Sequence, residues 1–156
     1  MAKSIPAPVA AFLAGKRFAV AGVSRESAQA ANAVFRKLES AGYEAVPVNP
    51  ATATVEGTTC YPDLASVPGA LDGVVVATHP KVAADVVRQA AARGVRQIWF
   101  HRSFGDGSVS PAALAECARQ GIEPLVGGCP LMYCQPIDFG HRCMHWWLRR
   151  QHRVPG

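Results

Sequence analysis

The stretch from Arg17 to Asn49 constrains the fold most, because it predicts a strand, a tight turn, a helix and a second strand in succession. The first strand is apolar and ends at Gly22, a residue type that lets the backbone turn sharply. The helix that follows directs its free N–H groups and the positive end of its dipole towards the space above the turn. This layout is that of a nucleotide-binding half-fold, and it suits a phosphate group.

The turn departs from the usual dinucleotide fingerprint. Positions 22 to 27 read Gly-Val-Ser-Arg-Glu-Ser, so Ser24 stands where Gly-x-Gly-x-x-Gly has its second glycine. The second strand ends in Asn49 and Pro50, and not in the Asp or Glu that holds an adenosine ribose in NAD proteins. Ser24 and Arg25 can both hydrogen-bond a phosphate. These residues favour a more heavily phosphorylated adenosine ligand over NAD, and a parallel-sheet turn with an N-capping Ser is the alternative.

The rest of the chain alternates apolar strands with amphipathic helices. This pattern predicts an α/β fold with a parallel sheet of about five strands and helices on both faces. We expect one Rossmann-like domain at residues 16–136, a helical arm at 1–15, and a helix with a basic tail at 137–156. The later strands are expected at 44–48, 73–77, 95–100 and 122–126. The helices between them are expected at about 31–41, 82–93 and 111–120, and Asp63 is expected to cap a short helix that ends near Gly69.

In an open parallel sheet the ligand site lies above the carboxyl ends of the strands. Five predicted loops meet at that edge, and together they form the expected site: 22–25, 49–50, 78–81, 100–102 and 127–130.

Length, charge and cysteine content narrow the class of protein. A chain of 156 residues suits one domain, and its formal charge of +5 comes partly from arginines near its end. Because no nucleic-acid-binding motif accompanies them, we expect an anionic small ligand or a solvated basic helix, and no nucleic acid partner. We find no apolar run of membrane-spanning length and no signal peptide, so a cytoplasmic protein without a membrane segment is expected. Five scattered cysteines, an odd number, predict reduced thiols.

Six short motifs give a more specific indication. They are Ala21-Gly-Val-Ser-Arg, Pro47-Val-Asn-Pro, Val55-Glu-Gly-x-x-Cys-Tyr-Pro-x-Leu, Val74-Val-Val-Ala-Thr-x-Pro, Ile98-Trp and Gly128-Cys-Pro-Leu-Met. With these motifs, nearly the whole chain resembles the stand-alone coenzyme A (CoA)-binding proteins, which are similar to the CoA-binding domain of the succinyl-CoA synthetase alpha subunit. The resemblance implies that coenzyme A is the ligand.

The resemblance also implies a role for each loop. The first turn would hold the CoA phosphates, the end of the second strand would border the adenosine, and the turn after strand 73–77 would lie along the pantetheine arm. These roles fall, in that order, on Gly22, Val23, Ser24 and Arg25, on Asn49 and Pro50, and on Thr78, His79 and Pro80.

The chain departs from the family pattern in two places. After Ile98-Trp99 the family usually has a Gln and a small loop, whereas this chain has the bulky basic sequence Phe100-His-Arg-Ser-Phe-Gly, so contacts from His101 are not expected. The synthetase subunit also has a second domain with a phosphorylated His, and this chain is too short to include one. Ligase activity is therefore not expected.

No catalytic or metal-binding residue is predicted. Cys129 would lie at the mouth of the site, where a glycine turn can lower a thiol pKa, but packing in the turn is favoured. His79 has no neighbouring carboxylate in the sequence to orient it. The spacing from Cys129 and Cys134 to His141 and His145 does not fit a zinc finger.

The sequence thus predicts a protein that binds CoA or acyl-CoA as a carrier, a sensor or a partner module. One alternative is a small enzyme that acts on NAD(P) or acyl-CoA through His79, His101 or Cys129. Another is a thiol redox sensor in which Cys129 pairs with the thiol of CoA. A homo-oligomer and a separate protein partner are both left open.

Overall fold

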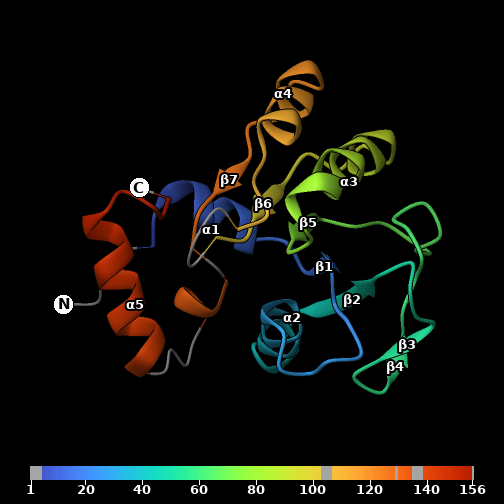
Figure 1. The fold of residues 1–156 in the computed structure, drawn as a ribbon, viewed down its shortest axis with the longest axis horizontal. Coiled ribbons are helices and arrows are strands. Elements are labelled where there is room, and N and C mark those ends of the chain that lie inside the picture. Colours follow the sequence, from blue (N-terminus) through green and yellow to red (C-terminus); the bar gives the residue numbers. More distant parts are fainter. Residues whose placement is uncertain (1–4, 103–106, 129, 135–138, 156) are drawn as a thin grey trace.

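A computed structural model describes residues 5–102, 107–128, 130–134 and 139–155. Its centre is a five-stranded sheet in which all neighbouring strands are parallel (Figure 1). In spatial order the strands are β2 (Glu44–Val48), β1 (Arg17–Ala21), β5 (Gly73–Val76), β6 (Ile98–Phe100) and β7 (Leu125–Val126). The three central strands are buried on both faces, as expected for a parallel sheet covered by helices.

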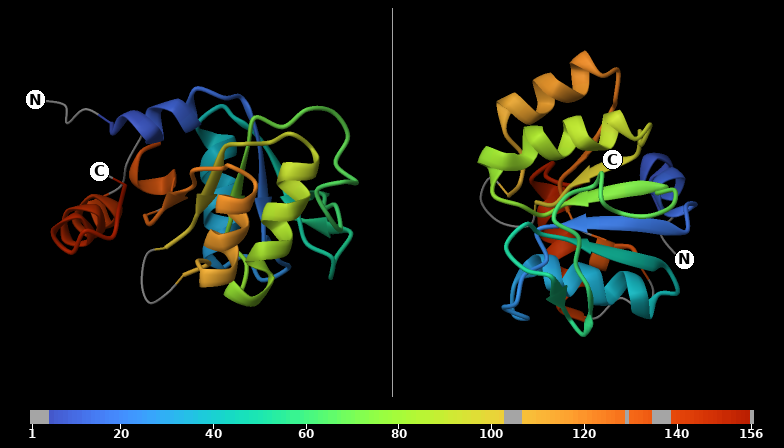
Figure 2. Two further views of the ribbon diagram at one scale, coloured as in Figure 1. Left: turned by 90° about the horizontal axis from the view of Figure 1, so that it is seen from above. Right: turned by 90° about the vertical axis from the view of Figure 1, so that its right-hand side faces the viewer.

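Helices cover both faces of this sheet (Figure 2). One face carries α1 (Ala7–Leu13), α2 (Ala30–Ser40), the 3₁₀ turn η1 (Pro130–Met132) and α5 (Phe139–Arg150). The other carries α3 (Pro80–Ala92) and α4 (Pro111–Arg119). Side chains alternate along the strands, so Val75 packs into the first core and Val74 and Val76 into the second. The predicted fold class is confirmed.

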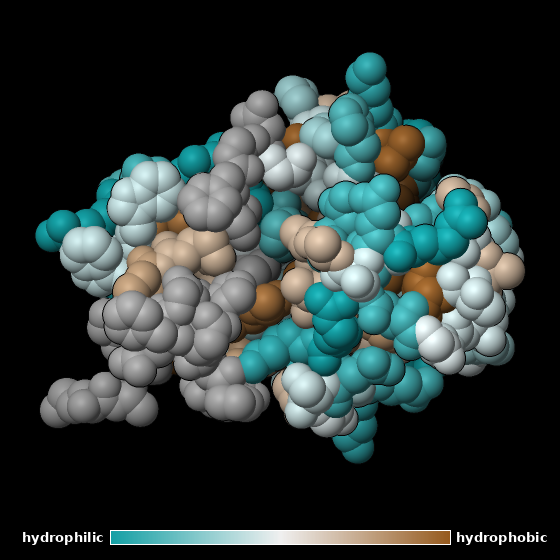
Figure 3. All heavy atoms as spheres, turned by 60° about the horizontal axis from the view of Figure 1, so that its bottom comes forward, coloured by the Kyte–Doolittle hydropathy of each residue, from teal (hydrophilic) through white to brown (hydrophobic). Residues whose placement is uncertain are grey.

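Local sequence signals account for most helix positions. The predicted apolar stripe of α2 (Ala31, Val34, Phe35 and Leu38) is buried, and Gly42 follows the helix with a φ of 92°. The polar side of α2 faces solvent. Among the residues that Figure 3 colours by hydropathy, hydrophilic ones cover most of the surface, and the apolar areas between them are small. At α4 the Ser110 hydroxyl accepts the N–H of Ala113 at 3.1 Å, and Pro111 is the first helical residue, as predicted.

Strands β6 and β7 begin three residues later than predicted. The apolar residues before them are held by the preceding helices, because Val95 N–H donates to Ala90 C=O and Ile122 N–H donates to Cys117 C=O. Both side chains are buried without pairing in the sheet. The length of each apolar run therefore exceeds the length of its strand, because a residue can be buried without forming hydrogen bonds in the sheet.

The prediction of a short helix after Asp63 is wrong. The Asp63 carboxylate does accept the N–H of Ser66 at 2.7 Å, but residues 63–69 form only turns. Their carbonyls are bound instead by two arginines from distant elements. Arg93, the C-cap residue of α3, donates to three of them, including Val67 O at 2.6 Å, and Arg17 of β1 donates to Pro68 O at 2.7 Å. These long-range bonds replace the ones that a helix would have formed.

The segment before these turns contains a small hairpin that the sequence left as irregular. It consists of β3 (Thr54–Val55) and β4 (Thr58–Thr59), which pair antiparallel. The two connecting residues, Glu56 and Gly57, have φ values of 48° and 74°. Two consecutive left-handed residues are what a tight two-residue hairpin requires.

The last helix belongs to the same core as the sheet. Leu148 of α5 is fully buried in one cluster with Phe18 and Trp99. The chain after α5 packs on the end of β7, where an added Cβ at Gly127 would lie 2.0 Å from Arg153 O. None of the helices in the described ranges has the length and apolarity needed to cross a lipid bilayer.

Candidate functional site

The candidate site begins where the helices change sides. The helix after β1 covers one face of the sheet and the helix after β5 covers the other, although the two strands are neighbours. Such a switch point opens a crevice at the carboxyl ends of the strands. Gly22 lies at its base with a φ of 106°, and an added Cβ there would lie 2.4 Å from Ala77 O. The two strand ends can approach this closely only because residue 22 has no side chain.

The turn after Gly22 is held by a buried amide that the sequence reading missed. Asn32 of α2 is fully buried; its Oδ1 accepts the N–H of Ser24 at 3.0 Å and its Nδ2 donates to Ser24 O at 2.7 Å. The same Nδ2 donates to Glu56 of the small hairpin at 2.8 Å, and Arg36 pairs with that carboxylate at 2.6 Å. The sequence signal for this buried amide was Asn32 itself, a polar residue among the apolar residues of α2.

Two predicted ligand contacts have partners within the protein. The Asn49 amide donates to Val23 O at 2.9 Å, and its Oδ1 accepts the N–H of Ala51 at 2.9 Å. The Ser24 hydroxyl accepts the N–H of Glu26 at 3.1 Å. In this structure both side chains therefore shape the turn. Contacts between these residues and a ligand stay a prediction.

The segment between the turn and α2 also carries positive charge. Arg25 is exposed, and α2 begins at Ala30 with Gln29 as its N-cap, whose side chain makes no capping hydrogen bond. The alternative of a turn with an N-capping Ser is wrong in its capping residue, because the N-cap of α2 is Gln29 and not a serine. The first-turn N–H groups of a helix are its positive end, so they and Arg25 both favour an anion here.

The turn after β5 lies beside Gly22 and contains an unpaired hydroxyl. The Oγ1 atom of Thr78 is buried and has no hydrogen-bond partner within the described part of the chain. Next to it, the exposed His79 is the N-cap of α3, and its Nδ1 accepts the N–H of Lys81 at 3.2 Å. Pro80 is the first residue of α3. A buried hydroxyl without a partner calls for an explanation, and a ligand group is one.

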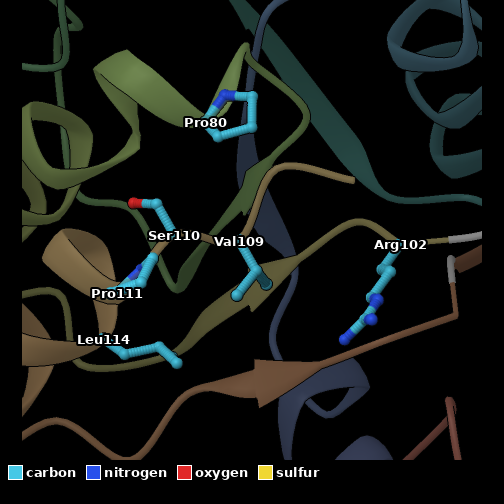
Figure 4. A pocket seen from close by; sticks show the side chains of 6 residues that line it. All are labelled: Pro80, Arg102, Val109, Ser110, Pro111 and Leu114. Atoms are coloured by element: carbon cyan, nitrogen blue, oxygen red, sulfur yellow. The ribbon is translucent and has the colours of Figure 1, made fainter. Parts of the chain in front are cut away.

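Further along the same edge there is a pocket of about 490 Å³ (Figure 4). Its lining comes from the starts of α3 and α4 and from the segment between β6 and α4: Pro80, Arg102, Val109, Ser110, Pro111 and Leu114. Beside this segment, burial lowers the pKa of His101 below its usual value, so the ring is neutral at pH 7.

The predictions about thiols and metals are tested only in part. Cys129, and with it the redox-sensor alternative, lies outside the described residues, as does the side chain of His141. Cys60, Cys117 and Cys134 are buried, and burial raises their pKa values, that of Cys134 to about 11, so these thiols are protonated at neutral pH. The described residues include no cluster of three His, Cys, Asp or Glu side chains that could hold a metal ion.

A family model described as a CoA binding domain matches residues 16–135. The chain belongs to the CoA-binding domain family. The resemblance that the motifs indicated is thus confirmed for the family.

Solved structures share this fold. A conserved hypothetical protein from Pyrococcus furiosus is 29% identical with a TM-score of 0.61, over 70% of this chain and 90% of that one. A hypothetical protein from Pyrococcus horikoshii is 25% identical with a TM-score of 0.71, over 83% of this chain and 93% of that one. An acetyl-coenzyme A synthetase from Ca. Korarchaeum cryptofilum, solved with phosphate and ADP, shares the fold at 22% identity and a TM-score of 0.61; the match covers 70% of this chain and 25% of the synthetase.

Proposed function

We propose that this CoA-binding-domain protein binds CoA or acyl-CoA across the carboxyl edge of its sheet and acts as a carrier, a sensor or a partner module. The observation that carries the proposal is the prearranged turn at the switch point. Asn32 and Asn49 hold this turn from two sides, next to the Thr78 hydroxyl, which has no partner among the described residues. A site that is ordered before binding loses less entropy when the ligand arrives.

In the proposed complex the CoA phosphates lie near Arg25 and the start of α2. The backbone N–H and the hydroxyl of Ser24 already have internal partners, so the attraction for phosphate comes mainly from the guanidinium and the helix N-terminus. The adenosine borders Asn49 and Pro50, and the pantetheine arm passes Thr78, His79 and Pro80. An amide of pantetheine supplies the missing partner for the Thr78 hydroxyl.

The described residues along the carboxyl edge of the sheet favour a protein that binds its ligand without catalysis over an enzyme. The Nδ1 atom of His79 is the acceptor in the α3 cap, so the ring would have to leave this cap to act as an oriented base. Burial lowers the pKa of His101, which leaves its ring neutral at pH 7; this is the form that a general base needs, so it does not argue against catalysis. An enzyme acting on acyl-CoA through these residues is the competing proposal, and release of free thiol from acyl-CoA esters by the purified protein would support it.

Calorimetric titration with CoA, dephospho-CoA and NAD tests the binding proposal. We expect CoA to bind more tightly than NAD, and Arg25→Ala to weaken CoA binding by about 1 to 3 kcal/mol, the contribution of a charged hydrogen bond. Lys16→Ala is the matched control, because it removes one exposed positive charge just before β1, at the opposite edge of the sheet. Equal affinities for CoA and NAD, or equal effects of the two substitutions, would contradict the proposal.

A further inference from the structure

The pocket at the start of α3 and α4 adjoins the proposed path of the pantetheine arm. Pro80 belongs both to this path and to the pocket lining, and Thr78 lies two residues before it. The reactive end of CoA is the end of the pantetheine arm. A ligand that follows the edge from Gly22 past Thr78 therefore arrives at this pocket with its thiol or thioester.

The walls of the pocket are mostly apolar and are held in place. Pro80 and Pro111 are the first residues of α3 and α4, and their rings restrict the backbone at two sides of the pocket. The Ser110 hydroxyl already accepts the N–H of Ala113, so this polar group in the lining has a partner. Its volume of about 490 Å³ falls within the range of small-molecule pockets.

Leu114 and Arg102 reach into the pocket from opposite sides (Figure 4). Leu114 is 39% exposed, which makes it one of the few large apolar side chains of the described residues that remain open to solvent. An apolar group in the pocket would remove this side chain from water. The guanidinium of Arg102 makes the other side polar, so the pocket suits a short apolar group and disfavours a long one.

We propose that this pocket receives the acyl group of short-chain acyl-CoA esters. The inference rests on the proposed CoA site and adds to it the class of thioester that the protein prefers. The acyl chain would pack on Leu114, Val109 and Pro111, with Thr78 and Pro80 guiding the pantetheine arm into place. The preference would then come from burial of methylene groups, each of which can tighten binding by up to about fourfold.

The experiment compares the affinities of CoA, acetyl-CoA, butyryl-CoA and palmitoyl-CoA for the full chain by calorimetry. We expect butyryl-CoA to bind several-fold more tightly than CoA, acetyl-CoA to lie between them, and palmitoyl-CoA to gain nothing over butyryl-CoA. In Leu114→Asp, a charge in the pocket should abolish the gain of butyryl-CoA over CoA. Leu114→Trp, which fills the pocket, should do the same.

Ala115→Asp is the matched control, because it places the same charge on the next exposed residue of α4, outside the pocket lining. It should keep the full gain for butyryl-CoA. If CoA binds but the acyl esters bind no more tightly, the acyl pocket is wrong and the CoA site stands. A gain that persists in both Leu114 variants would also overturn the acyl pocket. Absence of CoA binding altogether would overturn the proposed function as well.

Discussion

Gly22 holds the first turn in a conformation that would strain any residue with a side chain. Two separate costs meet there, a φ of 106° and a backbone oxygen, Ala77 O, only 2.4 Å from where a Cβ would lie. Gly42 has only the first of these costs, because its φ is 92° but nothing lies within 4 Å of an added Cβ. Comparing the same substitution at Gly22 and at Gly42 therefore separates the cost of backbone strain from the cost of disturbing the close packing between β1 and β5.

At this scale we expect Gly22→Ala to destabilise the protein more than Gly42→Ala. The left-handed backbone should cost each variant about 1 to 2 kcal/mol. The clash with Ala77 should add to this cost only at Gly22, and the shift of the two strand ends should also weaken CoA binding. Urea denaturation followed by circular dichroism measures both stabilities. Equal losses in the two variants would mean that the close approach of the strands is unimportant.

At the scale of elements, α3 and α4 are joined by a buried carboxylate. Glu116 of α4 is almost fully buried and pairs with Arg119 of the same helix and with Arg88 of α3, the latter at 3.2 Å. Hydrogen bonds from Arg119, Gln120 and Arg88 lower the Glu116 pKa from 4.5 to about 2. This pair of helices also carries the walls of the proposed acyl pocket, so their relative position matters for the site.

The depressed pKa predicts how stability changes with pH. Because the folded state favours the ionised carboxylate, the stabilisation is fully present above pH 4.5 and is lost as the pH falls towards about 2. Glu116→Gln should therefore be less stable than the wild type at pH 7, and the difference should shrink between pH 4.5 and 2. Thermal melts across this range measure it, with the exposed Glu39→Gln as control. A difference that does not depend on pH would contradict the assignment.

At the scale of the whole molecule, the two ends of the chain complete one face of the sheet. Val9 and Phe12 of α1 and Leu148 of α5 are buried in the same cluster as the sheet residues Phe18 and Trp99. Phe12 stacks on Phe18, with 4.8 Å between the ring centroids. The predicted boundaries at residues 15 and 136 stay a prediction, but both terminal helices contribute to the central core.

Leu148→Ala tests this contribution from α5. Removing a fully buried leucine side chain should cost about 2 to 5 kcal/mol, because the cavity left behind closes only in part. Arg149→Ala, at the exposed neighbouring position, should change stability by no more than about 0.5 kcal/mol. Chemical denaturation of the two variants gives the comparison. If Leu148→Ala were as mild as its neighbour, α5 would be an appendage and not part of the core.

The sequence was sufficient wherever a structural feature depends on neighbouring residues. The stripe of α2, the Ser110 cap, the turn at Gly22 and the parallel strands follow from periodicity and from residues within a few positions of each other. The loops of the candidate site were also predictable, because a parallel sheet brings the carboxyl ends of its strands to one edge. The motifs were enough to indicate the family.

The roles of the loop side chains depend on how distant segments pack together. Asn32 meets Glu56 and Asn49 meets Val23 across more than twenty residues, so no local pattern identifies them as supports of the turn. The segment after Asp63 begins with a residue that can cap a helix, yet its carbonyl groups accept hydrogen bonds from Arg93 and Arg17. Hydrogen bonds between distant elements exist only once the chain is packed, and this is why the sequence determined the fold and the edge of the site while packing determined its individual contacts.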